Sequence, residues 1–262
     1  MLLTDKVLII SGVGPGLGRE LSEARRARAP RSCVWRGRPS SSRGVAADIR
    51  AGGGTATPVA GDVTSGADCE RVAAIVAAEY GRLDGLVNSA FSVGALGVFP
   101  DVDLDDWRTA LEVNLFGALR LVQAVLPLLE EGGGGTVINV NTTSSLRPMR
   151  GQGAYGTSKA ALEFATRQLA VELGDRGIRA NTVYCGPMAG PSLDDAMDSW
   201  ARRQARPRAE IEADVASVMA LGYIPEDAEA AQLILLLLAD GARVVTGTSI
   251  HATGGAWVEQ RF

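Results

Sequence analysis

Strand-like and helix-like patterns alternate along all 262 residues of the chain, and no other feature limits the possible folds as strongly. Short apolar runs typical of buried strands occur at Val7–Ile10, Thr55–Ala60, Leu83–Asn88, Thr136–Val140, Ile178–Tyr184 and Thr248–His251. Helical patterns lie between them, at Ala67–Tyr80, Leu104–Leu129, Tyr155–Leu173 and Asp227–Ala239. Parallel strands need crossover connections, usually helices, so the alternation predicts an α/β fold with a doubly wound parallel sheet. No linker or change of composition divides the chain, so we expect one domain over residues 1–262.

One segment, residues 22–43, departs from this pattern. Its sequence, SEARRARAPRSCVWRGRPSSSR, is rich in Arg, Ser and Pro where a helix and a second buried strand are expected. Pro30 would damage a helix interior, and only Cys33–Trp35 offers an apolar core for a strand. One interpretation is a pair of compensating reading-frame shifts in the coding sequence, or a locally degenerate stretch. The other is a real but unusual strand.

The charge and residue counts exclude several classes of protein. The chain carries 26 basic and 30 acidic residues, whereas a nucleic-acid-binding domain needs a basic surface. His251 is the single histidine, so no multi-histidine metal site can form, and we expect no metal. The longest apolar run, Leu233–Ala239, is too short to span a bilayer, and the start of the chain lacks a signal-peptide pattern. The three scattered cysteines suit free thiols in a reducing compartment, which predicts a cytoplasmic protein.

A glycine-rich turn follows the first predicted strand. Gly12, Gly16 and Gly18 stand in the stretch KVLIISGVGPGLGRE, where a strand runs into a helix. Glycines let the backbone turn tightly and approach a pyrophosphate with no Cβ in the way, and the following helix presents free N–H groups. The spacing G-x-x-x-G-x-G differs from the commoner dinucleotide pattern G-x-G-x-x-G. The motif indicates a phosphate site, and a turn without a ligand is the alternative.

A tyrosine and a lysine four residues apart begin one of the helical patterns. This spacing places both on one face of a helix, so the phenol of Tyr155 and the ammonium of Lys159 are expected to project the same way. A neighbouring cation stabilises a phenolate, so we expect the pKa of Tyr155 to be lowered toward working pH, which suits a proton donor and acceptor. Lys6 and Lys159 are the only lysines among the 26 basic residues, which favours a specific need for an ammonium here.

The predicted strand that ends in VINVNTTSSL delivers hydroxyl groups to the carboxyl edge of the sheet. They belong to Thr142, Thr143, Ser144 and Ser145. Ligands of open α/β sheets bind at that edge, so these hydroxyls can polarise a substrate oxygen. A turn that uses Ser and Thr for local backbone hydrogen bonds is the alternative.

Taken together, the motifs resemble those of the short-chain dehydrogenase/reductase family, in its compact single-domain form, over nearly the whole chain. The glycine motif, Gly61-Asp62-Val63, a helical Asn114, the hydroxyl-bearing strand end and Tyr155-x-x-x-Lys159 occur in the family's order and spacing. The resemblance implies a Rossmann fold and an oxidoreductase that transfers a hydride between NAD(P)(H) and a secondary alcohol or ketone. A catalytically idle dinucleotide-binding sensor on the same fold is the alternative function.

The resemblance also implies a role for each matching residue. Tyr155 would be the acid/base, Thr142 would occupy the place of a catalytic serine, and Lys159 would hold the nicotinamide ribose. Asn114 would keep a helix open around a water that relays protons through Lys159. The cofactor would lie along Gly12, Gly16, Leu17, Gly18, Asp62, Val63, Asn88, Ala90, Tyr155, Lys159, Gly186 and Met188.

Three positions depart from the family's pattern. Thr142 keeps the hydroxyl of the usual serine but is stiffer at χ1. Phe91 replaces a glycine next to the cofactor, so either the backbone there avoids a glycine-only conformation or the ring projects into the pocket. Cys185 replaces a proline, and we expect a small buried residue here rather than a nucleophile.

The choice between the two nicotinamide cofactors depends on the end of the second strand, where an acidic residue binds a ribose 2′-hydroxyl and an arginine a 2′-phosphate. That end carries Arg36, Arg38 and Arg43 and no acidic residue. The arginines favour NADP(H) over NAD(H), with Arg38 as the expected contact, and merely solvated arginines are the alternative.

The resemblance implies that residues 189–223 correspond to the family's substrate lid. Apolar residues alternate there with arginines, which suits a mobile cover with an apolar underside, and an ordinary amphipathic helical pair is the alternative. We expect His251 to be a core or interface residue. The resemblance further implies a dimer or tetramer, paired through Leu104–Leu129 and Tyr155–Leu173, that acts on a small alcohol or ketone.

Overall fold

A computed structural model describes residues 3, 5–14, 16–23, 31–36 and 39–256, and the statements below concern that part of the chain. Seven parallel strands form one sheet in the order β3-β2-β1-β4-β5-β6-β7. They are β1 (Val7–Ser11), β2 (Arg31–Arg36), β3 (Ala56–Ala60), β4 (Gly85–Asn88), β5 (Gly135–Thr142), β6 (Ile178–Cys185) and β7 (Ser249–Ala252). The chain leaves β1 toward one side of the sheet and β4 toward the other. The carboxyl ends of these two strands therefore mark the switch point, where ligands of such sheets bind.

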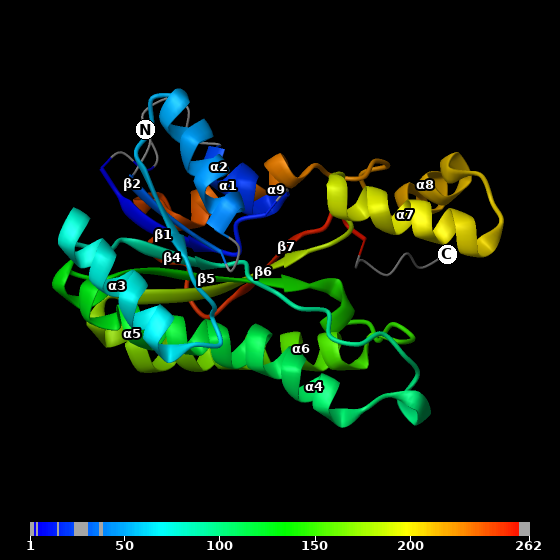
Figure 1. Cartoon of the computed structure of the whole chain (residues 1–262), viewed down its shortest axis with the longest axis horizontal. Helices are drawn as coiled ribbons and strands as arrows, with labels where there is room; N and C mark the ends of the chain where they lie inside the picture. The colour runs from blue at the N-terminus through cyan, green and yellow to red at the C-terminus, as the bar shows by residue number, and fades with distance from the viewer. Residues whose placement is uncertain (1–2, 4, 15, 24–30, 37–38, 257–262) are drawn as a thin grey trace.

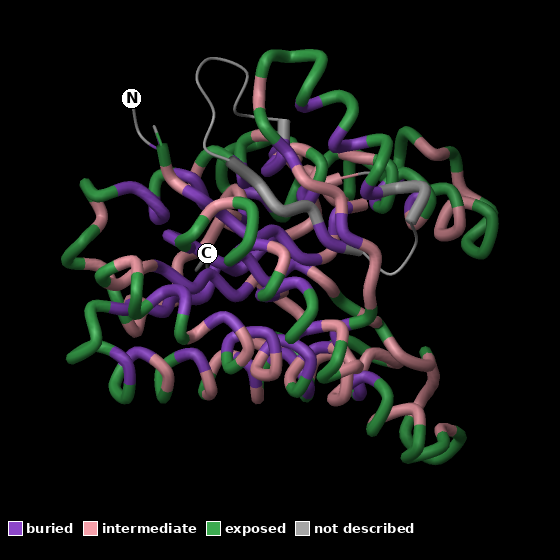
Figure 2. The backbone as a smooth tube through the Cα atoms, turned by 60° about the vertical axis from the view of Figure 1, so that its left-hand side comes forward, coloured by how far each residue is buried: buried purple, intermediate pink, exposed green. Residues whose placement is uncertain are grey.

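Helices cover both faces of the sheet, as the sequence predicted (Figure 1). One face carries α1 (Leu17–Glu23), α2 (Pro39–Ala51) and α9 (Asp227–Leu238), and the other carries α3 (Gly66–Tyr80), α4 (Leu104–Leu111), α5 (Ala118–Glu131) and α6 (Gly153–Leu173). Each face of the sheet has its own hydrophobic core, and alternate residues of β1 point into the two cores. Leu8 and Ile10 pack with α1 and α9, while Val7 and Ile9 pack with α3 and α5. A strand buried on both faces has a continuous apolar sequence, which is why the strands could be predicted from apolar runs. Figure 2 shows the buried residues concentrated in the strands and in the helix faces turned toward them.

The segment that departed from the sequence pattern contains the expected strand. β2 pairs with β1 from Val7↔Arg31 to Ser11↔Trp35, and with β3 on its other side. Trp35 is 1% exposed and packs in the core beneath α3, so one large aromatic side chain supplies much of the strand's apolar volume. The real but unusual strand is therefore confirmed, while the reading-frame shifts concern the gene and stay a hypothesis.

The helical pattern predicted over residues 104–129 is interrupted by a π-helical turn. α4, the π-helical turn Glu112–Gly117 and α5 follow one another without a break over Leu104–Glu131. By length and composition alone this run could cross a membrane, and 39% of its apolar window is buried within the protein. Leu121 and Val125 on α5 pack against the sheet, so its apolar residues are accounted for by the core of the fold.

The predicted lid consists of two short helices, α7 (Pro191–Gln204) and α8 (Arg208–Ser217), which project beyond the carboxyl end of β6 (Figure 1). The pair has a small apolar core of its own, formed by Leu193, Met197 and Ile211. Arg208 ties the two helices together through ion pairs with Asp194 and Asp198 of α7.

Candidate active site

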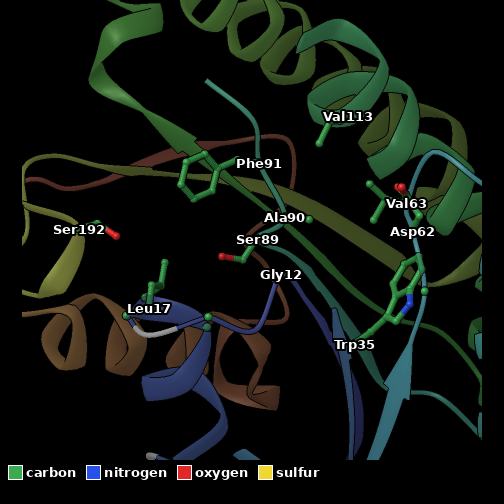
Figure 3. A pocket seen from close by; sticks show the side chains of 14 residues that line it. Gly12, Leu17, Trp35, Asp62, Val63, Ser89, Ala90, Phe91, Val113 and Ser192 are labelled. Carbon is green, nitrogen blue, oxygen red and sulfur yellow. The ribbon is translucent and has the colours of Figure 1, made fainter. Parts of the chain in front are cut away.

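Two adjoining cavities open at the carboxyl edge of the sheet. The first has a volume of about 440 Å³ and lies over the ends of β1, β2 and β4. The second, about 270 Å³, lies over the ends of β5 and β6 and reaches α6 and α7. Residues common to both linings are Gly16, Leu17, Ser89, Phe91 and Ser192. The two cavities thus form one continuous cleft, and Figure 3 shows the first of them with Trp35 and Phe91 at opposite ends.

The glycine-rich turn closes the floor of the first cavity. Gly12 has φ +80°, and a Cβ there would lie 2.2 Å from the backbone nitrogen of Ala90, so β1 and β4 can approach only at a glycine. A Cβ on Gly18 would lie 2.6 Å from the carbonyl oxygen of Gly12, so α1 also packs directly on the turn. Gly16 and Leu17 line both cavities. The turn therefore forms a bare glycine cradle with α1 beginning at its edge, and the binding of phosphates there stays a prediction.

Trp35, Asp62 and Val63 line the far end of the first cavity (Figure 3). The Oδ1 atom of Asp62 accepts hydrogen bonds of 2.9 Å from the backbone N–H and the hydroxyl of Thr64, which holds the loop after β3 in a tight turn. The indole Nε1 of Trp35 is buried and has no partner within the described residues. Arg38, which was predicted to contact the cofactor, lies outside the described residues.

Buried amides beneath the cleft connect three elements of the fold. The Nδ2 atom of Asn88 donates to Oδ1 of Asn139 at 2.9 Å, and Nδ2 of Asn139 donates to the Thr166 hydroxyl of α6 at 2.8 Å. These polar positions on β4 and β5 fix the register of α6 against the sheet. The side chain of Asn88 thus takes part in this network and is not among the residues that line the two cavities, and its place along the cofactor stays a prediction. Ala90, two residues later, does line the first cavity.

Asn114 sits in the π-helical turn and clamps the loop after β4. Its Oδ1 accepts from the backbone N–H of Ser92 at 2.8 Å, and its Nδ2 donates to the carbonyl oxygen of Ser92 at 2.7 Å. The same Nδ2 donates to the hydroxyl of Ser158 at 2.8 Å, one residue before Lys159. The helix is therefore opened at the predicted asparagine, whose amide joins the loop, the turn and α6.

Tyr155 and Thr142 meet in the second cavity. Tyr155 lies in the first turn of α6, and Thr142 ends β5, so one helix and one strand of the buried network position them. Burial raises the pKa of Tyr155 to about 12, while the hydrogen bond from the Thr142 hydroxyl lowers it. The expectation of a lowered pKa was wrong for the protein alone, because desolvation of the phenolate outweighs the stabilising contacts.

Lys159 lies on the same face of α6 and is 2% exposed. Its Nζ donates a hydrogen bond of 2.7 Å to the carbonyl oxygen of Val140 on β5. Burial lowers the pKa of Lys159 to about 8. The helix is held at this point by Asn141, whose Nδ2 donates to the carbonyl oxygen of Lys159 at 2.9 Å. The ammonium therefore borders the second cavity from a fixed position.

The remaining predicted residues at the end of β6 also line the second cavity. Gly186 and Met188 do so, as predicted, together with Cys185. Burial raises the pKa of the Cys185 thiol to about 12, so it stays protonated and matches the expected inert residue. His251 stacks on the buried Tyr184 with ring centroids 4.9 Å apart, on the edge strand β7.

Several cavity residues were not among the predicted site residues. Phe91 was noted only as a departure from a pattern, and its side chain proves to line both cavities. Asp227, at the start of α9, places its carboxylate against the glycine turn, where the backbone N–H of Leu17 hydrogen-bonds to it. Ser192 and Leu193 reach the cleft from α7. Trp35 and Asp227 gave no signal in the sequence, because only the fold brings them to the glycine turn.

Comparisons with known proteins agree with this geometry. A family model described as enoyl-(acyl carrier protein) reductase matches residues 12–256. The short-chain reductase protein NovJ of Streptomyces niveus is 30% identical over 96% of this chain and 94% of its own length. The 2,5-dichloro-2,5-cyclohexadiene-1,4-diol dehydrogenase LinX of Sphingobium indicum is 27% identical over 97% of this chain and 96% of its own. The structure of a short-chain type dehydrogenase/reductase from Mycobacterium ulcerans superposes with a TM-score of 0.90 at 25% identity, covering 99% of this chain and 92% of that one.

Proposed function

Since this chain belongs to the short-chain dehydrogenase/reductase family, we propose that it transfers a hydride between NAD(P)(H) and a secondary alcohol or ketone, with Tyr155 as acid/base. Its relatives are dehydrogenases and reductases, and it is an oxidoreductase of an alcohol or carbonyl group in a small molecule. The observation that carries the finer proposal is that Tyr155, Thr142 and Lys159 line one cavity, directly beside the glycine cradle.

The residues present fit a dinucleotide. A side chain at Gly12 or Gly18 would collide with backbone, so the turn keeps a bare surface of the kind that phosphates need. Asp62 and Val63 would hold the adenine end, and Gly186 and Met188 the nicotinamide end. Gly16, Leu17 and Ala90 would lie between them. When bound, the cofactor supplies or accepts the hydride at the carbon opposite its ring nitrogen.

Tyr155 would give a proton to the substrate oxygen during reduction and take it back during oxidation. Thr142 would hold the same oxygen, because it lines the same cavity as Tyr155 from the end of β5. Lys159, held on Val140, would place a positive charge beside the cofactor ribose and the phenol, and so offset part of the cost of burying a phenolate. Asn114 would keep the helix open at the π-helical turn, beside Ser158 and Lys159, where a relay of protons to solvent can pass.

The test is an assay of reduced nicotinamide absorbance over a panel of ketones and secondary alcohols, with NADP(H) and NAD(H) in parallel. The proposal expects turnover with at least one substrate and cofactor. A protein that binds a dinucleotide, as followed by its fluorescence, and turns over no substrate would instead be the idle sensor. The intact set of Asn114, Thr142, Tyr155 and Lys159 argues against that alternative.

For the cofactor itself, we favour NADP(H), because basic residues and no acidic one follow the core of β2. The expected result is a lower dissociation constant for NADP⁺ than for NAD⁺ in the wild type. Replacing Arg38 by Glu should reverse that order, and an unchanged order would show that the arginine is merely solvated.

We further propose a cytoplasmic homo-oligomer, a dimer or tetramer, with α7 and α8 (within residues 189–223) acting as the lid. Large apolar side chains stay exposed on the helices expected to pair, among them Phe116 in the π-helical turn and Phe164 and Val171 on α6. Light scattering coupled to size exclusion should give two or four times the 27.3 kDa of the chain.

A further inference from the structure

Phe91 stands at the junction of the two cavities that form the cleft. It follows β4 by three residues, and its side chain is 58% exposed although it is large and apolar. Its ring touches that of Tyr155, with centroids 6.2 Å apart and planes tilted by 47°. Because rings at this distance are already in contact, a ligand can cover only the remaining exposed surface of Phe91. An apolar surface of this size next to a reacting group favours a ligand that removes it from water.

The backbone holds the Phe91 ring in this place. Asn114 binds both the N–H and the carbonyl oxygen of Ser92, the next residue, at 2.8 and 2.7 Å. Among described residues the only non-glycine residues with positive φ are Asp5 and Ala205, so the φ of Phe91 is negative. The backbone at this position therefore does not need the glycine that the family has there. A ring held on both sides, by Tyr155 and by the clamped loop, is prepared for packing at little cost in conformational entropy.

The rest of the second cavity divides into a polar floor and an apolar wall. The floor carries the hydroxyls of Thr142 and Tyr155 and the ammonium of Lys159. The apolar wall is built from Pro187, Met188 and Leu193, the last of them on α7. Among described residues the charged side chains in the lining are Lys159 and Asp227, and Lys159 is already bound to Val140. The proposed function assigns Lys159 to the cofactor ribose, and no second cation stands among the described lining residues for a substrate carboxylate or phosphate, which favours a neutral substrate.

We propose that Phe91 determines substrate specificity: its exposed surface packs on a ring attached to the reacting carbon, so the enzyme prefers neutral, ring-bearing secondary alcohols and ketones. This inference rests on the proposed function, because it assumes that the reacting oxygen binds at Thr142 and Tyr155. The ring of the substrate then lies between Phe91 and the apolar wall, with its oxygen at the polar floor.

The experiment compares kcat/KM for phenyl methyl ketone and octan-2-one, which have equal numbers of carbon atoms, in the wild type, Phe91→Leu and Phe91→Gly. We expect the wild type to prefer the phenyl ketone, and the ratio of the two kcat/KM values to fall about three- to tenfold in Phe91→Leu, where the aromatic contact is lost. Phe91→Gly should lower the ratio at least as far. Because Phe91 also lines the first cavity, the dissociation constant of the cofactor is measured by fluorescence titration in both variants. A change in cofactor binding affects both ketones alike, so the ratio of the two kcat/KM values still reports the substrate contact.

Phe99→Leu is the matched control. Phe99 lies on the same stretch between β4 and α4, is exposed, packs on Trp107 and lines neither cavity, so this variant should keep the wild-type ratio. An unchanged ratio in Phe91→Leu and Phe91→Gly, or a wild type that prefers octan-2-one, overturns the inference.

Binding of the two ketones to the protein saturated with oxidised cofactor, followed by calorimetry, separates this inference from the proposed function. If no ketone is reduced and no secondary alcohol is oxidised, the proposed function fails, and the binding arm still decides the role of Phe91. Tighter binding of the phenyl ketone that is lost in Phe91→Leu supports the inference, and equal binding of both ketones contradicts it.

Discussion

The ammonium of Lys159 donates a hydrogen bond of 2.7 Å to the carbonyl oxygen of Val140, on the strand whose end carries Thr142. Helix α6 and strand β5 thus meet at a buried charge, a single turn of helix away from Tyr155. The cost of burying that charge and the chemistry that it serves can be measured separately.

Replacement of Lys159 by methionine should abolish turnover without unfolding the protein. Burial of an ammonium disfavours the folded state, and an apolar side chain of similar length removes that cost, so the variant should melt at or above the wild-type temperature at pH 7. Burial lowers the pKa of Lys159 to about 8, so the unfolded chain binds the lysine proton more tightly than the folded protein does. The stability of the wild type therefore rises with pH between pH 8 and the usual pKa of a lysine. The advantage of the variant should therefore shrink across that range in thermal melts. A variant that unfolds at neutral pH would contradict this.

Thr142→Val should slow catalysis by about a hundredfold, because the variant keeps the shape of the side chain and removes the hydroxyl that holds the substrate oxygen. The Thr142 hydroxyl also lowers the pKa of Tyr155, so its loss should raise that pKa and move the alkaline rise of alcohol oxidation to higher pH. Thr142→Ser keeps the hydroxyl and serves as the control, with a pH profile like that of the wild type. Equal profiles for Thr142→Val and the wild type would remove Thr142 from the site.

Asp227→Asn should tighten cofactor binding at neutral pH. Burial first, and the charge of Glu20 second, raise the pKa of Asp227 to about 6, and the carboxylate lies at the Leu17 amide, beside the glycine cradle. Above pH 6 the ionised carboxylate of Asp227 repels the phosphates of the cofactor. Below pH 6 this carboxyl group becomes neutral in the wild type, so the dissociation constants of the wild type and the variant should converge as the pH falls. Fluorescence titration between pH 5 and 8 measures this. A constant difference across that range would show that charge is not the cause.

Asn139→Ala should destabilise the fold and disturb the site together. Its side chain joins Asn88 to Thr166, and each buried polar group left unpaired costs about 1–3 kcal/mol of unfolding free energy. Urea unfolding provides the measurement. The control is Gln168→Ala on α6, the helix that carries Thr166. It removes an exposed hydrogen bond and should change the unfolding free energy by less than about 0.5 kcal/mol. Similar losses in both variants would contradict a structural role for the buried network.

The fold could be predicted from the sequence because most strands are buried on both faces and so appear as short apolar runs. β6 was predicted over Ile178–Tyr184 and extends one residue further, to Cys185. β2 was obscured because its sequence, RSCVWR, holds one tryptophan, Trp35, where a buried strand usually has several β-branched residues. The apolar pattern did not show the π-helical turn Glu112–Gly117, because one extra residue in a turn hardly changes the apolar period of a long helix. Only the resemblance implied an open helix at Asn114.

The site was only partly predictable, for a different reason. Spacing along a helix correctly placed Tyr155 and Lys159 on one face of α6, but spacing carries no information on burial or on hydrogen-bond partners. The pKa prediction for Tyr155 failed for that reason. Asp227 reaches the glycine turn from the far end of the chain, so no local pattern could indicate it. The direction of the Phe91 ring likewise depends on the clamp at Ser92, which is a tertiary contact.

The central claim is that the phenol of Tyr155 moves the proton of the reaction, and Tyr155→Phe tests it most directly. The variant keeps the ring that packs on Phe91 and loses only the hydroxyl. Turnover of a substrate accepted by the wild type should fall by at least about a thousandfold, while the dissociation constant of the cofactor changes by less than about threefold. Turnover within about tenfold of the wild-type rate, with cofactor binding intact, would contradict the account.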